Sequence, residues 1–238
     1  MYAEAAAFYD AIQASRGLDA GMQAWVVLAE LRRRRASVGS LLDAGCGTGL
    51  HLPHFAAEVP EVVGLDLSPH MLAIAADRLP GGRLVEGDFR TFDLGTTFDA
   101  VITLFSGIGY LAEEHDLRTG IANLARHLRP GGVLLVEGWV EPEFWIGSTV
   151  SAESGTSDGR AVARAVRTVR DGLRTELWMR YVFAAEDGLT TVDEHHVMRL
   201  SDPAEMAAAF AAAGLGSFER LPHMLHPGRS VYVGVADG

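Results

Sequence analysis

The sequence has little cysteine and a deficit of positive charge. Cys46 is the single cysteine among 238 residues, so no disulfide can form within the chain, and we expect a reducing, cytoplasmic location. The formal net charge of −11 would repel a phosphate backbone. We therefore expect neither a disulfide-stabilised protein nor an enzyme that modifies nucleic acid.

Long apolar runs are also missing. No stretch approaches the roughly 20 apolar residues that span a bilayer, so we expect no membrane partner. Residues 1–4 do not begin a basic stretch followed by an apolar one, so we expect no signal peptide. Hydrophobic residues make up 48% and charged residues 21%, which is typical of a globular enzyme.

Short apolar strands alternate with helices in the first 139 residues. Helices are expected within the first forty residues, from about Leu50, from Pro69 behind the capping residue Ser68, and over 114–128. The last of these should stop at Pro130-Gly131-Gly132. We expect strands at 40–44, 62–67, 83–86, 98–105 and 133–137. This alternation predicts a doubly wound α/β core with a parallel sheet.

The pattern changes between residues 140 and 200. Asp171-Gly172 separates two strand-like stretches and is a strong hairpin signal, and a second turn at 186–188 leads into a further stretch. We therefore predict an antiparallel β insertion at 140–200, carried by a domain made of 1–139 and 201–238. The remaining elements are expected to be a helix at 203–213 and strands at 217–221 and 230–236.

A glycine-rich loop, Asp43-Ala44-Gly45-Cys46-Gly47-Thr48-Gly49, follows the first predicted strand. Doubly wound sheets bind ligands at the carboxyl ends of their strands, near the switch point where this loop is expected. Glycine has no Cβ and lets the backbone approach a ligand closely. Asp66 ends the second strand, where a carboxylate can accept from both hydroxyls of a ribose. The loop predicts a nucleotide-like ligand, although a tight turn without a ligand would also explain it.

Dinucleotides and S-adenosylmethionine (SAM) both fit this geometry. The dinucleotide fingerprint is G-x-G-x-x-G/A, whereas the spacing here is G-x-G-x-G and Leu50 stands where Gly or Ala is wanted. A pyrophosphate is therefore disfavoured. After the third strand, Asp88 can accept from an adenine amino group and the backbone N–H of Phe89 can donate to a ring nitrogen. Met71 can pack on the purine or belong to the core.

Four motifs in this order resemble the class I SAM-dependent methyltransferases: Leu42-Asp43-Ala44-Gly45-Cys46-Gly47-Thr48-Gly49, Gly64-Leu65-Asp66-Leu67-Ser68, Gly87-Asp88-Phe89 and Leu128-Arg129-Pro130-Gly131-Gly132. The resemblance implies a Rossmann-like methyltransferase sheet, with SAM as cofactor and S-adenosylhomocysteine as its product. The implied cofactor contacts are Tyr9, Arg16, Asp43, Gly45, Cys46, Gly47, Gly49, Asp66, Leu67, Met71, Asp88, Phe89 and Leu104.

Nearly the whole chain further resembles the TDP-aminosugar N,N-dimethyltransferases that make desosamine and mycaminose. The similar pieces include Phe8-Tyr9-Asp10, Leu104-Phe105-Ser106-Gly107-Ile108-Gly109-Tyr110 and Pro227-Gly228-Arg229. The resemblance implies a TDP-aminosugar substrate and a homodimer paired through the insertion. It places Tyr2 and Tyr110 beside the amine as catalytic residues, and it implies substrate contacts from Tyr2, Tyr110, Trp139, Arg164 and Arg229.

Departures from that family weaken the transfer of the exact sugar more than that of the cofactor. Leu18-Asp19-Ala20 stands where the family often has Lys-Asp-Tyr, and Trp139-Val140 replaces a pair of tryptophans. A methyltransferase for another small oxygen or nitrogen acceptor and a non-catalytic SAM-binding protein stay open as alternatives. A dehydrogenase is a third, which Leu50 disfavours. The sequence does not specify the sugar or the number of methyl groups added.

Several residues suggest chemistry but have simpler interpretations. His127 is interpreted as a cation at a helix C-terminus rather than as a base, and residues 32–35 as a solvated helix end. Cys46 is expected to be a small buried residue rather than a nucleophile. We expect no metal at Glu194, His195 and His196, because adjacent side chains on a strand point to opposite faces.

Overall fold

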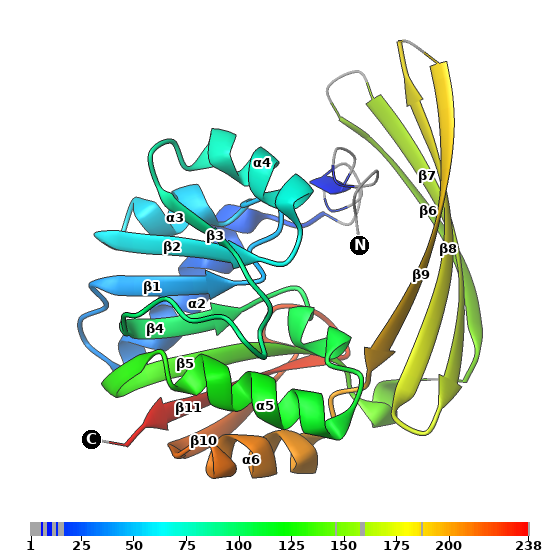
Figure 1. Ribbon diagram of the computed structural model, residues 1–238. Helices are drawn as coiled ribbons and strands as arrows, with labels where there is room; N and C mark the ends of the chain where they lie inside the picture. The colour runs from blue at the N-terminus through cyan, green and yellow to red at the C-terminus, as the bar shows by residue number, and fades with distance from the viewer. Residues whose placement is uncertain are drawn as a thin grey trace.

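A computed structural model describes residues 6, 9, 10, 13, 17–145, 147–157, 160–186 and 188–237. Within these residues, one sheet has the strand order β10-β11-β5-β4-β1-β2-β3 and a second has the order β6-β7-β8-β9 (Figure 1). No helix in the described part of the chain is long and apolar enough to cross a membrane.

The main sheet consists of β1 (Ser40–Ala44), β2 (Glu61–Asp66), β3 (Arg83–Glu86), β4 (Phe98–Thr103), β5 (Leu128–Val140), β10 (Leu215–Pro222) and β11 (Arg229–Ala236). Its helices are α2 (Ala20–Arg34), α3 (Leu52–Ala56), α4 (Pro69–Arg78), α5 (Glu114–Ala125) and α6 (Pro203–Ala212), with short 3-10 turns η1 (Gly107–Tyr110) and η2 (Pro142–Phe144). The second sheet consists of β6 (Thr149–Ser157), β7 (Arg160–Asp171), β8 (Arg174–Ala185) and β9 (Gly188–Arg199).

The chain reverses its direction of winding beside β1. Strands β3, β2, β1, β4 and β5 are parallel, and β11 pairs antiparallel with β5 and β10. In the second sheet all neighbours are antiparallel. The predicted doubly wound α/β sheet with an antiparallel insertion is therefore confirmed. Figure 1 shows β1, β2 and β4 pointing toward the second sheet, so the ligand-binding edge of the main sheet faces it.

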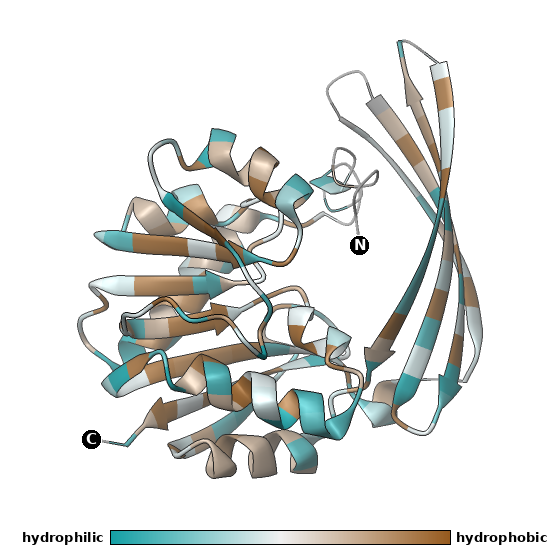
Figure 2. Cartoon of the chain, viewed as in Figure 1, coloured by the Kyte–Doolittle hydropathy of each residue, from teal (hydrophilic) through white to brown (hydrophobic). Residues whose placement is uncertain are grey.

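Strand side chains alternate between two cores. Leu41 packs in a cluster with Leu31 of α2, whereas Leu42 packs in a cluster with Ile121 of α5 and Phe210 of α6. Figure 2 shows hydrophobic residues along the central strands and hydrophilic ones on the outer side of α5. Both leucines are fully buried, and each such burial stabilises the fold by about 2 kcal/mol. The central strands are therefore apolar on both faces.

The largest differences from the predicted elements lie in the segment between α5 and β5, at the end of β4 and at β6. The helix predicted at 114–128 ends at Ala125, and β5 begins at Leu128, so Pro130-Gly131-Gly132 lies inside a strand with a register shift rather than after a helix. The strand predicted at 98–105 ends at Thr103, because Phe105 and Ser106 adopt left-handed backbone conformations. Strand β6 had no clear apolar alternation, yet it pairs with β7 along its whole length.

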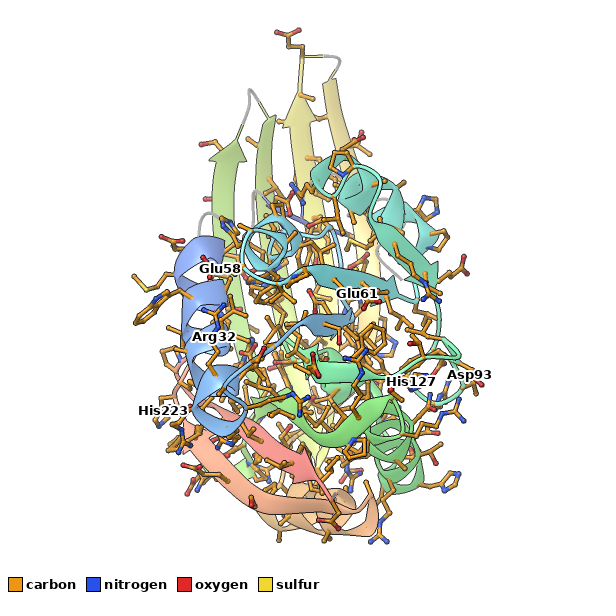
Figure 3. All side chains as sticks on the ribbon, turned by 90° about the vertical axis from the view of Figure 1, so that its left-hand side faces the viewer. Arg32, Glu58, Glu61, Asp93, His127 and His223 are labelled. Carbon is orange, nitrogen blue, oxygen red and sulfur yellow. The ribbon has the colours of Figure 1, made fainter. Side chains whose placement is uncertain are left out.

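The arginines that end α2 are a solvated helix end only in part, since the side chains of Arg32 and Arg33 are 43% and 54% exposed. The side chain of Arg34 is only 7% exposed and pairs with Glu30 and Glu219. Arg35 donates to Asp99 at 2.7 Å. Of this group, Arg32 lies at the surface beside Glu58, 3.1 Å away (Figure 3). The expectation was wrong for Arg34 and Arg35 because acidic partners come from distant strands.

His127 is a neutral structural residue and not a helix-end cation. It is 2% exposed, and burial lowers the pKa of its ring. Nδ1–H donates to the carbonyl of Asn123 at 2.8 Å, and Nε2 accepts from the backbone N–H of Leu94 at 3.3 Å. Figure 3 shows it beside Asp93, whose carboxylate is 3.9 Å away. The predicted charge was wrong because packing removed the ring from water.

Asp99 provides a test of this packing. Burial alone would raise its pKa, but the N–H of Gly39 and the charges of Arg35 and Arg129 lower it below the usual value. We expect Asp99→Asn to reduce the free energy of unfolding by about 3 kcal/mol at pH 7 in chemical denaturation. The stabilisation by Asp99 is present above the ordinary aspartate pKa of about 4 and is lost as the pH falls through the lower folded-state value.

The exposed carboxylate of Asp93, whose side chain is 70% exposed, is the matched control for that variant. Asp93→Asn should leave the denaturation midpoint nearly unchanged. Equal effects of the two substitutions would contradict the structural role given to Asp99.

Candidate functional site

The glycine loop is packed too tightly for larger residues at two positions. Gly45 has φ +80°, and a Cβ on it would lie 3.0 Å from the ring of Phe89. Gly49 has φ +77°, and a Cβ on it would lie 2.9 Å from the Cβ of Ala75 in α4. The loop is therefore in close contact with Phe89, which follows β3, and with α4, at the carboxyl edge of the sheet.

Asp66 is fixed at the tip of β2. Its Oδ2 accepts from the backbone N–H of Gly47 and its Oδ1 from that of Ser68, each at 2.8 Å. The same Ser68 caps α4, as predicted, and accepts from the N–H of Met71. Each carboxylate oxygen keeps lone pairs beyond these bonds. The carboxylate is thus preorganised to accept further hydrogen bonds from a ligand's hydroxyls.

The next two predicted cofactor residues differ in exposure. Leu67 is 55% exposed, which leaves an apolar side chain directly beside Asp66. Met71 is only 3% exposed and belongs to the core of the protein. Met71 was expected either to pack on the purine or to belong to the core. Contacts within the core bury most of its surface.

Two aspartates at this edge make it strongly acidic. Burial and the nearby charge of Asp66 raise the pKa of Asp43 to about 7. Burial also raises the pKa of Asp66, against the opposing effect of three backbone N–H groups. A cation bound beside these carboxylates would favour their ionised forms. The residues therefore fit SAM, whose sulfonium and amino groups are positive.

Cys46 is unsuited to nucleophilic chemistry. It is 8% exposed, and burial together with the charges of Asp43 and Asp66 raises the pKa of its thiol well above the ordinary value. A thiol that stays protonated is a poor nucleophile. Its place in the loop agrees with a small packing residue.

Asp88 follows β3, the strand that pairs with β2, but its carboxylate already has a side-chain partner, Arg90. Arg90 donates to its two carboxylate oxygens at 2.7 and 3.0 Å, and these bonds lower the pKa of Asp88. The neighbouring Phe89 presses its ring against Gly45 and Gly107, and its carbonyl accepts from Asn123 at 2.9 Å. Arg90 therefore holds the carboxylate in its ionised, accepting form at the end of β3.

An N-terminal contact to the loop was not predicted. Asp10 accepts from the Thr48 hydroxyl at 2.7 Å and from the Arg78 guanidinium. Arg78 also donates to the carbonyl of Thr48 at 2.6 Å. This places Tyr9, the residue before Asp10, close to the loop. Tyr2 and Arg16 lie outside the described residues.

The backbone after β4 is strained where it enters the site. Phe105 and Ser106 have φ of 50° and 62°, a region that non-glycine residues rarely adopt. Glu137 accepts from the N–H of Phe105 at 2.6 Å, and the Ser106 hydroxyl donates to the carbonyl of Gly138 at 2.7 Å. These bonds to β5 hold the turn that leads into η1 and Tyr110. Leu104 itself is only 3% exposed.

A buried polar chain lies beneath this turn. Burial alone would raise the pKa of Glu137, but a hydrogen bond from His226 and the charge of Arg229 lower it. Burial lowers the pKa of His51 to about 4, so the ring is neutral and its Nε2–H donates to Gln23 at 3.0 Å. The Gln23 amide in turn lies 3.3 Å from Nε2 of His226. Sequence patterns gave no signal for Gln23 or His226, because their partners are distant in the chain.

Tyr110 and Trp139 lie where the two sheets meet. Both pack against the apolar inner face of the second sheet, which includes Met198. The Tyr110 hydroxyl is 2.8 Å from Nδ1 of His196. The Arg229 guanidinium lies over the Trp139 ring, 4.8 Å from its centroid.

Each of the two arginines predicted to bind the diphosphate already lies beside a carboxylate. Arg164 pairs with Glu153 and its side chain is 14% exposed. Arg229 lies 3.6 Å from Glu137 and its side chain is 17% exposed. A diphosphate at either one would share it with a carboxylate, so these two contacts stay predictions.

The two adjacent histidines of β9 point to opposite faces. His195 lies 2.9 Å from Glu176 on the outer face, and His196 lies 3.2 Å from Glu194 on the inner one. Over the described ranges, no group of three or more His, Cys, Asp or Glu side chains could hold a metal ion.

Comparison with known proteins shows the family to which the chain belongs. A family model described as a methyltransferase domain matches residues 41–132. The dTDP-3-amino-3,4,6-trideoxy-alpha-D-glucopyranose N,N-dimethyltransferase of Streptomyces venezuelae is 40% identical over 230 residues, which cover 95% of each chain. The dTDP-4-amino-2,3,4,6-tetradeoxy-D-glucose N,N-dimethyltransferase of Saccharopolyspora spinosa is 37% identical, over 95% of this chain and 90% of its own.

The chain belongs to this family of SAM-dependent sugar N-methyltransferases. A solved structure, SAM-bound CalS10, an amino pentose methyltransferase from Micromonospora echinaspora, is 39% identical with a TM-score of 0.85. Each chain is covered to 96% in that comparison. The predictions of a methyltransferase and of SAM as cofactor are confirmed, and a dehydrogenase is excluded. The individual site residues stay predictions.

The methyltransferase offers a pH test of its acidic edge. Because the pKa of Asp43 is raised in the folded state, its contribution to stability is present below the ordinary aspartate pKa and is lost as the pH rises toward 7. In the cofactor-free protein, the free energy of unfolding of the wild type should fall as the pH rises from 5 to 8, whereas that of Asp43→Asn should not. The difference between the two should therefore change by about 3 kcal/mol in favour of the variant. The same variant should bind SAM at least roughly tenfold more weakly.

Denaturation at several pH values and calorimetry with SAM would measure these two effects. Asp77→Asn, at an exposed position of α4, is the matched control and should show neither. Parallel pH profiles for wild type and Asp43→Asn would contradict the account.

Proposed function

We propose that this methyltransferase transfers methyl groups from SAM to the amino group of a TDP-linked aminosugar in natural-product biosynthesis. The observation that supports this most is similarity to dTDP-aminosugar N,N-dimethyltransferases over 95% of the chain, which includes the second sheet as well as the cofactor domain. A match limited to the cofactor domain would support only a methyltransferase. The two relatives named above are named for substrates whose amino groups lie at different sugar carbons, C3 and C4, so we leave the position of the amine open.

The cofactor is proposed to bind along the carboxyl edge of β1, β2 and β3. Asp66 would accept from the ribose hydroxyls, and Asp43 would face the positive groups of SAM. The adenine would lie near Leu67, Asp88 and Phe89. The remaining proposed contacts come from Gly45, Cys46, Gly47, Gly49, Met71, Leu104, Tyr9 and Arg16.

The acceptor is proposed to lie between this edge and the inner face of the second sheet. SAM supplies a methyl group that its sulfonium already activates, so the protein contributes mainly alignment and proximity. Tyr110 would orient the neutral amine, with Tyr2 as a second hydroxyl. Trp139, Arg164 and Arg229 would contact the rest of the nucleotide sugar, the arginines through its diphosphate. Transfer would proceed in line.

We also propose a homodimer that is paired through the second sheet. Its outer face exposes apolar side chains that include Val150, 82% exposed, and Leu189, 76% exposed. Exposed apolar patches on a sheet commonly mark interfaces. A cytoplasmic location stays a prediction, which the buried single cysteine fits.

Sedimentation velocity at micromolar concentration should show a dimer for the wild type. Val150→Arg combined with Leu189→Arg should convert it into a folded monomer, because two charges would oppose pairing of the faces. A wild type that sediments only as a monomer would remove the dimer from the proposal.

The substrate proposal is tested by methyl transfer followed by mass spectrometry. Incubation with SAM and TDP-3-amino or TDP-4-amino sugars should give N-methylated nucleotide sugars and S-adenosylhomocysteine. Matched TDP-hydroxysugars and glycine serve as acceptor controls and should give no product above background. Turnover only on another acceptor would identify a different small-molecule methyltransferase. SAM binding without turnover on any amine would indicate a non-catalytic protein.

A further inference from the structure

A loop between β10 and β11 carries a histidine to the buried carboxylate beneath the site. His226 of this loop donates from Nδ1 to Oε1 of Glu137, and the two side chains are 14% and 1% exposed. On its other side, Nε2 of His226 lies 3.3 Å from the amide nitrogen of Gln23. The amide oxygen of Gln23 accepts from His51 at 3.0 Å. Four polar side chains thus form one line from the segment after the glycine loop to β5.

The positions of the protons along this line follow from both of its ends. Burial opposes the ionisation of Glu137, but the hydrogen bond from His226 and the charge of Arg229 outweigh it and lower the pKa of this carboxylate. An ionised carboxylate can only accept. At the other end, the Gln23 oxygen receives the Nε2–H of His51, so the amide N–H faces Nε2 of His226. Nδ1 of His226 therefore carries the proton, and Nε2 accepts.

Arg229 lies beside the same carboxylate oxygen without a hydrogen bond to it. Its Nη1 is 3.6 Å from Oε1 of Glu137, beyond the length of an N–H···O hydrogen bond. The guanidinium lies over the ring of Trp139, 4.8 Å from its centroid. In the part of the chain that the structure describes, its N–H groups donate no hydrogen bond. The guanidinium is therefore held in place while its donors remain available to a ligand.

We propose that His226 is a positioning residue for the diphosphate of the nucleotide sugar. By donating to Oε1 of Glu137, it keeps Arg229 from closing onto that oxygen and leaves the guanidinium to bind a diphosphate. The proposal rests on the proposed TDP-linked substrate. It assigns His226 an action through Glu137 and Arg229 rather than a contact with the ligand.

The effect of removing the Nδ1–H follows from the burial of Glu137. An ionised carboxylate that is 1% exposed cannot turn to water, and leaving it without its donor is strongly unfavourable. Arg229 is already paired with this oxygen, so its guanidinium would close onto Oε1 and form charge-assisted hydrogen bonds. Those donors would then be lost to a diphosphate. Oε2 would keep its bond from the N–H of Phe105, 2.6 Å away, so the turn that leads to Tyr110 would stay in place.

The backbone of the loop fixes the histidine relative to the arginine. The N–H of Arg229 donates to the carbonyl of His226 at 3.3 Å. The ring of His226 packs on that of Phe105, with centroids 5.3 Å apart. Between the two residues, Gly228 has φ +75°, which lets the chain turn back toward β11. A new side chain at position 226 therefore changes the donor at Glu137 while these backbone features remain.

Two amides of different length test the donor itself. His226→Asn places an amide nitrogen next to Cγ, where Nδ1 stands, so it can still donate to Glu137. His226→Gln places the nitrogen one bond further out, where Nε2 stands, and leaves Oε1 without its donor. In calorimetry we expect TDP to bind His226→Gln at least about tenfold more weakly than wild type, and His226→Asn within about threefold. S-adenosylhomocysteine should bind all three within about twofold, because its proposed contacts lie on other strands.

A double substitution tests whether the effect passes through Arg229. Arg229→Gln alone should weaken the binding of TDP, because it removes the guanidinium. Adding His226→Gln to it should change the affinity for TDP by no more than about twofold, because the group that His226 controls is already gone. Two losses that add would mean that His226 acts on TDP by another route, and would overturn the proposal.

His223, in the same loop, is the matched control. It is exposed (Figure 3), and its Nδ1 accepts from the N–H of Gly228 at 2.9 Å. The amide oxygen of His223→Asn can accept that bond in its place. This variant should leave the affinities for TDP and for S-adenosylhomocysteine unchanged.

Nitrogen-15 NMR of the histidine rings provides a readout without any ligand, and it should show His226 with its proton on Nδ1. A ring without a proton there would overturn the proposal. Wild-type affinity for TDP in His226→Gln, or equal losses in His226→Asn and His226→Gln, would also overturn it. A wild type that binds S-adenosylhomocysteine but not TDP would instead contradict the proposed function, and this inference with it.

Discussion

Three carboxylates, those of Asp43, Asp66 and Glu137, lie near the carboxyl ends of parallel strands. Each is removed from water, so its charge needs hydrogen-bond donors or positive charges nearby. An uncompensated buried charge costs several kcal/mol. Asp66 accepts hydrogen bonds from backbone N–H groups. Glu137 accepts hydrogen bonds from His226 and from the N–H of Phe105, and it lies near the charge of Arg229. For Asp43, both burial and its neighbour Asp66 raise the pKa, to about 7. The edge is thus arranged around a charge that a bound cation would balance.

The same compensation shapes the acceptor side of the site. Glu137 holds the left-handed turn at Phe105, and that turn sets the place of η1 and of Tyr110. Glu137 also pairs with Arg229, which lies over Trp139. One buried carboxylate on β5 therefore links the backbone that presents the tyrosine to the side chains that would meet the nucleotide sugar.

The placement of the candidate cofactor residues in the fold could be predicted from sequence because it is local. The glycine loop follows β1 directly, Asp66 ends β2, and the tips of adjacent parallel strands must lie side by side. The proposed acceptor side depends on contacts between distant segments, such as Tyr110 with His196, 86 positions apart, and Gln23 with His226, 203 positions apart. No periodicity or motif carries such pairings.

Two errors at the sequence level have the same origin. The charge assigned to His127 and the exposure assigned to Arg34 came from their places at helix ends, where cations are commonly solvated. Tertiary packing placed His127 under the loop at Leu94 and Arg34 against Glu219. Local position predicts the element correctly, but it does not predict what the rest of the chain places beside it.

The central claim is that one edge of the sheet binds SAM beside a separate site for a TDP-linked sugar. Calorimetry with S-adenosylhomocysteine and TDP, each alone and both together, tests it most directly. The account predicts that both bind at once and that Asp66→Ala loses S-adenosylhomocysteine while it retains TDP. Competition between the two ligands, or binding of S-adenosylhomocysteine that is unchanged in Asp66→Ala, would contradict it.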